Sequence, residues 1–185
     1  MKNIVLIGLP TAGKSTIGVI LAKTVGMNFI DTDIVIQEKT GRLLQKIIDE
    51  EGSEAFLEIE EKTVISLKGN PAVIATGGSV VYSQRAMEHL KSDGVIVYLE
   101  ISFDEMVRRL KNIKTRGIVR IPGQSLCDLY HQRIPLYEKY ADIRIDCSDD
   151  DFEKVVDNIQ MNEYFKVLTD TQRIPVYHLS ELRKI

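Results

Sequence analysis

One short segment near the N-terminus constrains this chain more than any other feature. It reads GLPTAGKS over residues 8–15 and fits the phosphate-binding pattern G-x-x-x-x-G-K-[ST] at every fixed position. A β-branched run at residues 3–9 precedes it, and an amphipathic helical pattern at 15–25 follows it. Because this pattern binds phosphate between a strand and a helix, we favour a phosphate-binding loop over a chance glycine-rich turn.

The segment also predicts how a nucleoside triphosphate is held. Backbone N–H groups of the loop and of the helix N-terminus point at phosphate oxygens. We expect Lys14 to reach the β- and γ-phosphates and the Ser15 hydroxyl to ligate Mg²⁺. The residues expected to contact the nucleotide are Gly8, Leu9, Pro10, Thr11, Ala12, Gly13, Lys14, Ser15 and Thr16.

Length and composition narrow the class of protein. The chain has 185 residues and a formal net charge of −3, which favours one domain with a sizeable core and gives no support for nucleic acid or an anionic membrane as partner. We find no secretory signal, no apolar stretch of membrane-spanning length and, with Cys127 and Cys147 alone, no disulfide framework. We therefore expect a cytoplasmic enzyme.

Strand-like and helical patterns alternate along the chain. Apolar runs occur at 4–7, 27–30, 72–75, 95–99 and 143–145, and helical patterns at 15–25, 53–67, 83–90, 103–110 and 126–140. This alternation predicts an α/β fold, a three-layer sandwich with a central, mostly five-stranded parallel sheet. Ligands of such sheets bind beyond the carboxyl ends of the strands.

Two motifs follow predicted strands and are candidates for that edge. Asp31 and Asp33 flank Thr32, and in an extended chain both carboxylates point the same way, one toward the Mg²⁺ water shell and the other toward an acceptor hydroxyl. The alternative is a helix N-cap. Gly77 and Gly78 would let backbone N–H groups approach an acceptor, or form a plain turn.

A basic segment lies farther along the chain. Its cations are Arg108, Arg109, Lys111, Lys114, Arg116 and Arg120. It could close over a triphosphate as a lid or form an ordinary solvated face, and the phosphate loop favours the lid. Cys127 and His131 are one helical turn apart, but without a second ligand pair nearby we interpret them as ordinary helix residues.

The chain resembles the shikimate kinase family over roughly residues 3–160. The resemblance rests on the strings GLPTAGKSTIG, DTDIVIQEKTGR, FLEIEE, ATGGSVV, VIVYLEIS, TRGIV and RIPLYEKYADIRID, in this order and spacing. It implies a P-loop NTPase fold similar to that of nucleoside monophosphate kinases, with ATP and Mg²⁺ as cofactors. The implied reaction moves the γ-phosphoryl group of ATP to a ring hydroxyl of shikimate, a step of aromatic amino-acid biosynthesis.

The resemblance also implies roles for single residues. Lys14, Asp33 and Arg116 would be catalytic, with Arg116 in a lid around residues 111–123. Asp31 and Ser15 would be the metal residues, and Arg109 would stack on adenine. The acceptor would be held by Asp33, Gly77, Gly78, Arg133 and Glu60.

Several positions depart from the family pattern. Leu57 stands where the family has an arginine, which would weaken binding of the shikimate carboxylate by about 10- to 100-fold if nothing compensates. Ser79 replaces a third glycine, Gly117-Ile118-Val119 departs from the usual lid sequence, and Thr11 replaces a common loop glycine. Three of these departures, at Leu57, at Ser79 and in the lid, lie around the acceptor and the lid, whereas the groups for ATP and Mg²⁺ are intact.

The sequence is also compatible with other functions. The acceptor could be another hydroxylated carboxylate or amino acid, such as gluconate or homoserine. The chain could also be a catalytically weak nucleotide-binding regulatory protein or, less in keeping with Arg133, a nucleoside monophosphate kinase. We expect one kinase domain over residues 1–160, a C-terminal extension over 161–185, and a monomer, with a weak oligomer as the alternative.

Overall fold

A central parallel sheet organises the protein. The computed structural model describes residues 2–110, 119, 123–148, 151–163 and 165. Within them one sheet has the strand order β2-β3-β1-β4-β5, and all its pairings are parallel. The strands are β1 (Asn3–Ile7), β2 (Asn28–Asp31), β3 (Ala72–Ala75), β4 (Gly94–Glu100) and β5 (Ile143–Asp146). The predicted five-stranded parallel sheet is thereby confirmed.

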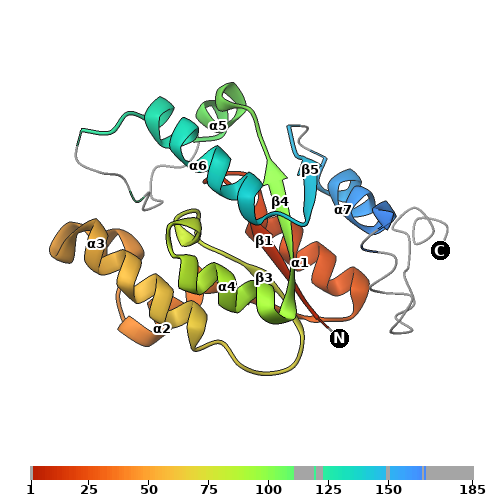
Figure 1. Cartoon of the computed structure of the whole chain (residues 1–185), viewed down its shortest axis with the longest axis horizontal. Coiled ribbons are helices and arrows are strands. Elements are labelled where there is room, and N and C mark those ends of the chain that lie inside the picture. The colour runs from red at the N-terminus through yellow and green to blue at the C-terminus, as the bar shows by residue number, and fades with distance from the viewer. Residues whose placement is uncertain (1, 111–118, 120–122, 149–150, 164, 166–185) are drawn as a thin grey trace.

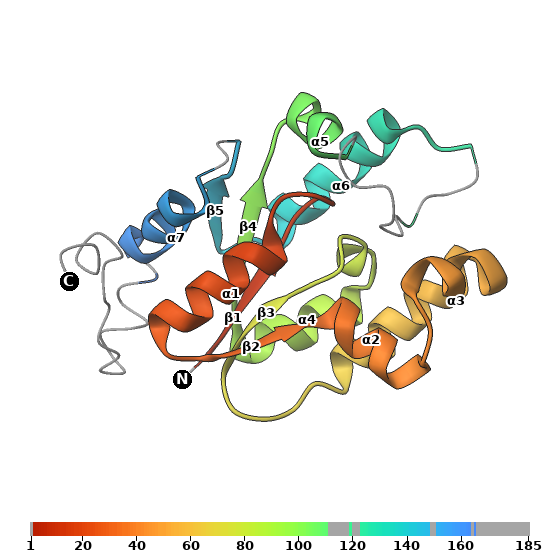
Figure 2. The same cartoon turned by 180° about the vertical axis from the view of Figure 1, so that it is seen from behind.

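Helices cover both faces of this sheet. They are α1 (Lys14–Val25), α2 (Thr32–Thr40), α3 (Leu44–Ile65), the 3₁₀ turn η1 (Val80–Tyr82), α4 (Gln84–Asp93), α5 (Phe103–Leu110), α6 (Leu126–Tyr140) and α7 (Phe152–Met161). Figures 1 and 2 show α1 and α7 on one face and α4 and α6 on the other, with α2 and α3 to one side. This is the predicted three-layer sandwich.

The sequences of the inner strands explain their place. β3 is buried at every residue, and β4 is buried at all but its last residue. Such continuous apolar runs are typical of parallel strands that are covered on both faces. β1 lies between them, with Leu6 paired to Ala75 on β3 and to Val97 on β4. The main core therefore fills both sides of the sheet.

The strand register brings three loops to one edge of the sheet. The phosphate loop follows β1, Asp31 ends β2, and Thr76 follows β3. Asp31 pairs with Ala75, and Ala75 pairs with Leu6, so the three strands end at the same level. The motifs that the sequence placed after separate strands therefore meet at one edge.

The sequence patterns missed some helices. α2, the first part of α3 and α7 were not predicted. The predicted helix at 53–67 is only the second part of α3, whose helical geometry breaks at Gly52 with φ 85° and ψ 171°. Positive φ there favours glycine, so Gly52 marks the joint between two shorter helices.

A second apolar cluster lies beside the main core. Ile36, Ile47, Phe56 and Val119 form it, and they come from α2, both parts of α3, and the predicted lid. The rest of that lid, 111–118 and 120–122, and the predicted extension beyond residue 165 lie outside the described residues. None of the helices in the described ranges has both the length and the apolar character that crossing a membrane requires.

Candidate active site

The phosphate loop has the backbone that its glycines require. Gly13 caps α1 with φ 88°, and Gly8 has φ 148°. A β-carbon at Gly8 would lie 2.5 Å from the Leu99 carbonyl oxygen, so a side chain cannot fit there. Lys14 Nζ donates to the carbonyl oxygens of Gly8 and Leu9, at 2.8 Å each. The Lys14 side chain thus folds back over the phosphate loop, so that its ammonium group lies next to the loop.

Ser15 and Asp31 meet where a metal would be held beside the phosphates. The Ser15 hydroxyl donates to Asp31 Oδ2 at 2.6 Å. Asp31 Oδ1 accepts from the backbone N–H of Asp33 at 2.9 Å and so caps α2. The extended D-T-D geometry was therefore wrong and its N-cap alternative right, because Asp33 lies in the first turn of a helix. The Ser15 hydroxyl and the Asp31 carboxylate are hard oxygen donors, and such donors side by side fit Mg²⁺.

The described residues contain no cluster of three or more His, Cys, Asp or Glu that could hold a metal alone.

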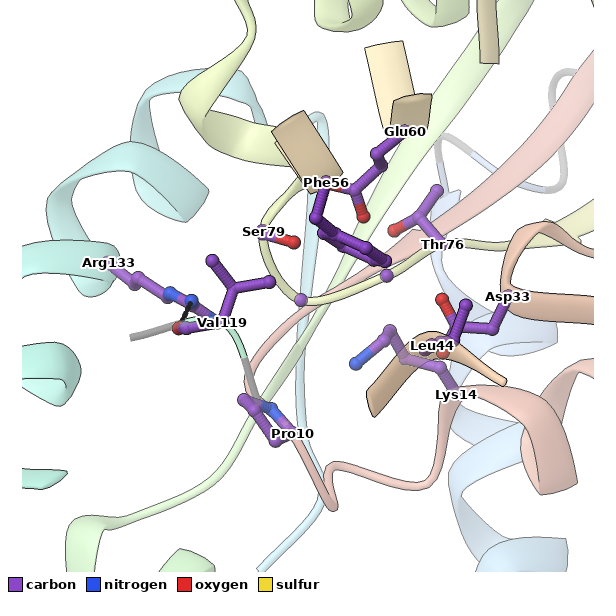
Figure 3. Close-up of a pocket in the computed structure, with 12 residues that line it drawn as sticks. Pro10, Lys14, Asp33, Leu44, Phe56, Glu60, Thr76, Ser79, Val119 and Arg133 are labelled. Carbon is purple, nitrogen blue, oxygen red and sulfur yellow. Dashed lines mark hydrogen bonds between the residues drawn. The ribbon is translucent and has the colours of Figure 1, made fainter. Parts of the chain in front are cut away.

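A pocket lies between the phosphate loop, α3 and α6. It encloses about 410 Å³, including its mouth toward solvent. Its lining residues are Pro10, Lys14, Asp33, Leu44, Phe56, Glu60, Thr76, Gly77, Gly78, Ser79, Val119 and Arg133. Figure 3 shows Lys14 and Asp33 on one side of this space and Arg133 on the other.

Two carboxylates converge on Gly77. A β-carbon there would lie 2.1 Å from Glu60 Oε1 and 3.1 Å from Asp33 Oδ1. Glu60 is buried, and its Oε1 has no hydrogen-bond partner among the described residues. Burial raises the pKa of Glu60 to about 7. A hydrogen bond from Ser79 opposes that rise, Asp33 adds to it, and the charges of Arg133 and Lys14 also oppose it.

Arg133 is a buried cation among neutral partners. Its Nε donates to the Tyr82 hydroxyl at 3.1 Å and its Nη2 to the Val119 carbonyl at 2.7 Å. Its third contact is a hydrogen bond with Tyr137, whose hydroxyl donates to the Gly78 carbonyl at 2.6 Å. Within the described part of the chain Arg133 forms no ion pair. A buried guanidinium without a negatively charged partner favours binding of an anionic ligand.

Arg109 lies on the other side of the phosphate loop. Its Nη1 donates to the Thr11 carbonyl at 3.3 Å and its Nη2 to the Cys147 carbonyl at 2.8 Å, while its Nε pairs with Glu105. Hydrogen bonds from Arg108, and then from Arg109, lower the pKa of Glu105 to about 2. Arg109 therefore bridges the loop and the end of β5, at the edge where the resemblance places the nucleotide base.

The structure brings most of the predicted site residues together. Lys14, Asp33, Gly77, Gly78, Glu60 and Arg133 line one pocket, and Ser15 and Asp31 lie in contact beside the phosphate loop. Thr16 is exposed in the first turn of α1. Arg116 lies outside the described residues. Leu57 does not line the pocket; it lines a neighbouring groove together with Tyr82 and Arg85.

Several supporting residues escaped the sequence patterns. The Thr32 hydroxyl accepts from the backbone N–H of Gly77 at 3.0 Å, which ties α2 to the loop after β3. Tyr82 and Tyr137 contact Arg133, and Phe56 lines the pocket. The Thr32 and Tyr82 contacts join segments far apart in sequence, so no periodicity points to them, and Tyr82, four residues after Gly78, belongs to no motif. Arg133 and Tyr137 lie four residues apart on α6, and that spacing could have pointed to their contact.

Comparison with known proteins identifies the family. The family model described as shikimate kinase matches residues 10–162. A shikimate kinase of Thermodesulfovibrio yellowstonii is 39% identical over 167 residues, 89% of this chain and 95% of that protein. One from Vibrio cholerae is 39% identical over 160 residues, 85% of this chain and 91% of its own.

A solved structure agrees with the sequence matches. Shikimate kinase from Acinetobacter baumannii, in complex with shikimate, superposes with a TM-score of 0.81 at 31% identity, covering 94% of this chain and 96% of that one. The fold, the phosphate loop and the length of the match all indicate the same family. This chain belongs to the shikimate kinase family of small-molecule kinases.

Proposed function

We propose that this protein transfers the γ-phosphoryl group of ATP to a hydroxyl of shikimate and forms shikimate 3-phosphate. One observation carries the proposal within the family. A single pocket holds the phosphate-loop lysine Lys14, the carboxylate of Asp33 and the buried cation Arg133. These three groups match a phosphoryl donor, an acceptor hydroxyl and an acceptor carboxylate.

The nucleotide side follows from the loop. Lys14 Nζ donates to two neutral backbone carbonyls of the loop, and the charged oxygens of a triphosphate would offer it stronger, charge-assisted hydrogen bonds. Ser15 and Asp31 would hold Mg²⁺, which, when bound, neutralises part of the phosphate charge. The position of Arg109 supports a role beside the adenine base. Arg116 keeps its proposed role as a lid arginine.

The acceptor side follows from the pocket. Asp33 would orient the attacking hydroxyl and accept its proton, while the hydroxyl oxygen bonds to the γ-phosphorus. The bond from that phosphorus to the β–γ bridging oxygen breaks, and ADP leaves with the electron pair. Arg133 would bind the acceptor carboxylate, and Glu60 Oε1, which has no hydrogen-bond partner among the described residues, would accept from a ring hydroxyl.

Two variants separate these roles. Lys14→Ala should lose about 10²-fold or more in kcat/KM, whereas Lys23→Ala, in the last turn of the same helix, should leave it unchanged. Arg133→Met should raise the shikimate KM by about 10- to 100-fold and leave the ATP KM within about twofold. A Lys14→Ala protein with full ATP-dependent phosphorylation would contradict the proposal.

A further inference from the structure

Arg133 is the proposed anchor for an acceptor carboxylate, and no carboxylate of the described residues forms an ion pair with it. Among the lining residues that the structure describes, the cations are Lys14 and Arg133. Lys14 is turned toward the carbonyls of its own loop. Among the residues that the structure describes, recognition of an anionic acceptor therefore depends on the orientation of the Arg133 guanidinium and on the residues that fix this orientation.

Tyr82 contacts this guanidinium in two ways. Its hydroxyl accepts from Arg133 Nε at 3.1 Å, and Arg133 Cζ lies over its ring, 5.1 Å from the centroid. The same hydroxyl donates to Gln132 Oε1 at 2.9 Å. Since a hydroxyl carries one proton, donation to Gln132 leaves its lone pairs to Arg133. The hydrogen bond at Nε and the contact with the Tyr82 ring together restrict rotation of the planar guanidinium.

The remaining nitrogens of Arg133 lie on the pocket side. Nη1 lies so near Gly78 that a β-carbon there would be 3.1 Å away, and Nη2 donates to the Val119 carbonyl. Both Gly78 and Val119 line the pocket. Tyr82 does not, and lines the neighbouring groove instead. Tyr82 thus holds the guanidinium at Nε, from the side away from the pocket, while Nη1 and the second N–H of Nη2 lie where a ligand in the pocket can accept from them.

We propose that Tyr82 is the positioning residue for acceptor-carboxylate recognition, because it fixes the plane in which Arg133 presents its terminal nitrogens. The inference rests on the proposed function, since shikimate supplies the carboxylate. It predicts a loss of acceptor affinity when Tyr82 changes, without loss of nucleotide binding or of the chemical step once the acceptor is saturating.

Steady-state kinetics of three variants test this inference. Tyr82→Phe removes the hydroxyl and keeps the ring, and should raise the shikimate KM about fivefold. Tyr82→Leu removes both contacts and should raise it about 30-fold. The matched control is Tyr140→Phe, at the end of α6. In every variant the ATP KM and kcat should stay within about twofold of the wild-type values.

A second readout separates positioning from mere folding and needs no acceptor. ¹⁵N relaxation of the Arg133 Nε–Hε group, assigned with Arg133→Lys, should show a rigid side chain in the wild type and in Tyr140→Phe. It should show a mobile one in Tyr82→Leu. A wild type inactive on shikimate, with this mobility change present, would overturn the proposed function and support the positioning role. An active enzyme whose Tyr82 variants keep both the KM and the rigid side chain would overturn the positioning role alone.

Discussion

Glu60 packs so closely against Gly77 that a β-carbon at this glycine would lie 2.1 Å from Glu60 Oε1. The same β-carbon would lie 3.1 Å from Asp33 Oδ1. Gly77 is therefore a glycine because two carboxylates need its space, and its φ is not among the positive ones. Asp33, the proposed base, and the buried carboxyl of Glu60 therefore both pack against the backbone of Gly77.

Gly77→Ala should damage both stability and activity. The new methyl group must displace Glu60, and overpacking of this kind costs about 1–3 kcal/mol in the free energy of unfolding. We expect kcat/KM for shikimate to fall by about 10²-fold, because Asp33 shifts with its neighbour. Urea unfolding and initial rates measure the two effects. Glu60→Asp shortens the opposing side chain, so the Glu60→Asp/Gly77→Ala double variant should regain most of the lost stability; an equally unstable double variant would contradict the clash.

The buried Glu60 should give stability a pH dependence. Its folded pKa of about 7 is raised above the unfolded value of 4.5, so its contribution is complete below pH 4.5 and is lost as pH rises toward 7. The difference in unfolding free energy between wild type and Glu60→Gln should therefore shift against the wild type by ~3 kcal/mol across that range. Urea titrations at pH 4.5, 6 and 7.5 measure it. A difference that stays constant with pH would show that Glu60 titrates normally.

Removing the Ser79 hydroxyl should move this pH window. Ser79 lies at the start of η1, has φ −93°, and its side chain makes no capping hydrogen bond there. It donates to Glu60 instead and lowers the pKa of that group. Ser79→Ala should thus raise the pKa of Glu60 further and carry the loss of stability to higher pH. Ser53→Ala, in α3, serves as the control, and an unchanged window in Ser79→Ala would exclude the hydrogen bond.

Thr11 holds a backbone conformation that a threonine rarely adopts. Its φ is 71°, and its buried hydroxyl has no hydrogen-bond partner among the described residues. Relief of the left-handed strain gains about 1–2 kcal/mol, and the added freedom of an unfolded glycine costs about 0.4–1 kcal/mol. Thr11→Gly should therefore raise Tm by about 2–4 °C, measured by calorimetry. Thr11→Ala keeps the β-carbon and should gain less; a Thr11→Gly protein that melts below the wild type would contradict the strain.

Leu57→Arg tests whether the acceptor site accommodates a second guanidinium. Position 57 follows Phe56, which lines the pocket, while Leu57 itself lines the neighbouring groove with Tyr82. A charge-assisted hydrogen bond to the shikimate carboxylate should lower the shikimate KM about tenfold, with the ATP KM unchanged. Leu57→Met controls for the change of shape. An unchanged KM would show that a guanidinium at position 57 does not reach the acceptor carboxylate.

Much of the fold could be predicted because its signals are local. The buried apolar runs of β1, β3 and β4 are continuous, and the phosphate loop at 8–15 requires a strand before it and a helix after it. α2 escaped because only Thr32 and Ile36 of its residues are buried, which is too few for a clear apolar stripe. α7 had a signal, since Asp151 caps it and Val155, Val156 and Ile159 share a face.

The site was predicted unevenly for a physical reason. Lys14, Ser15 and Asp31 belong to motifs whose spacing is set by one strand and one helix. The partners of Arg133 differ in this respect. Tyr137 lies four residues after Arg133 on α6, a spacing that indicates contact on a helix, whereas Tyr82 reaches Arg133 from η1. The Tyr82 contact depends on how distant segments pack, and spacing within the sequence cannot reveal it.

The most direct test of the account is phosphorylation of shikimate by the wild-type protein with ATP and Mg²⁺. ADP release is followed by a coupled assay, the product by ³¹P NMR, and Asp33→Asn serves as the matched variant. We expect one ADP for each shikimate 3-phosphate, with kcat reduced by about 10²-fold or more in Asp33→Asn. ATP that binds without any turnover, even at high shikimate concentration, would contradict it.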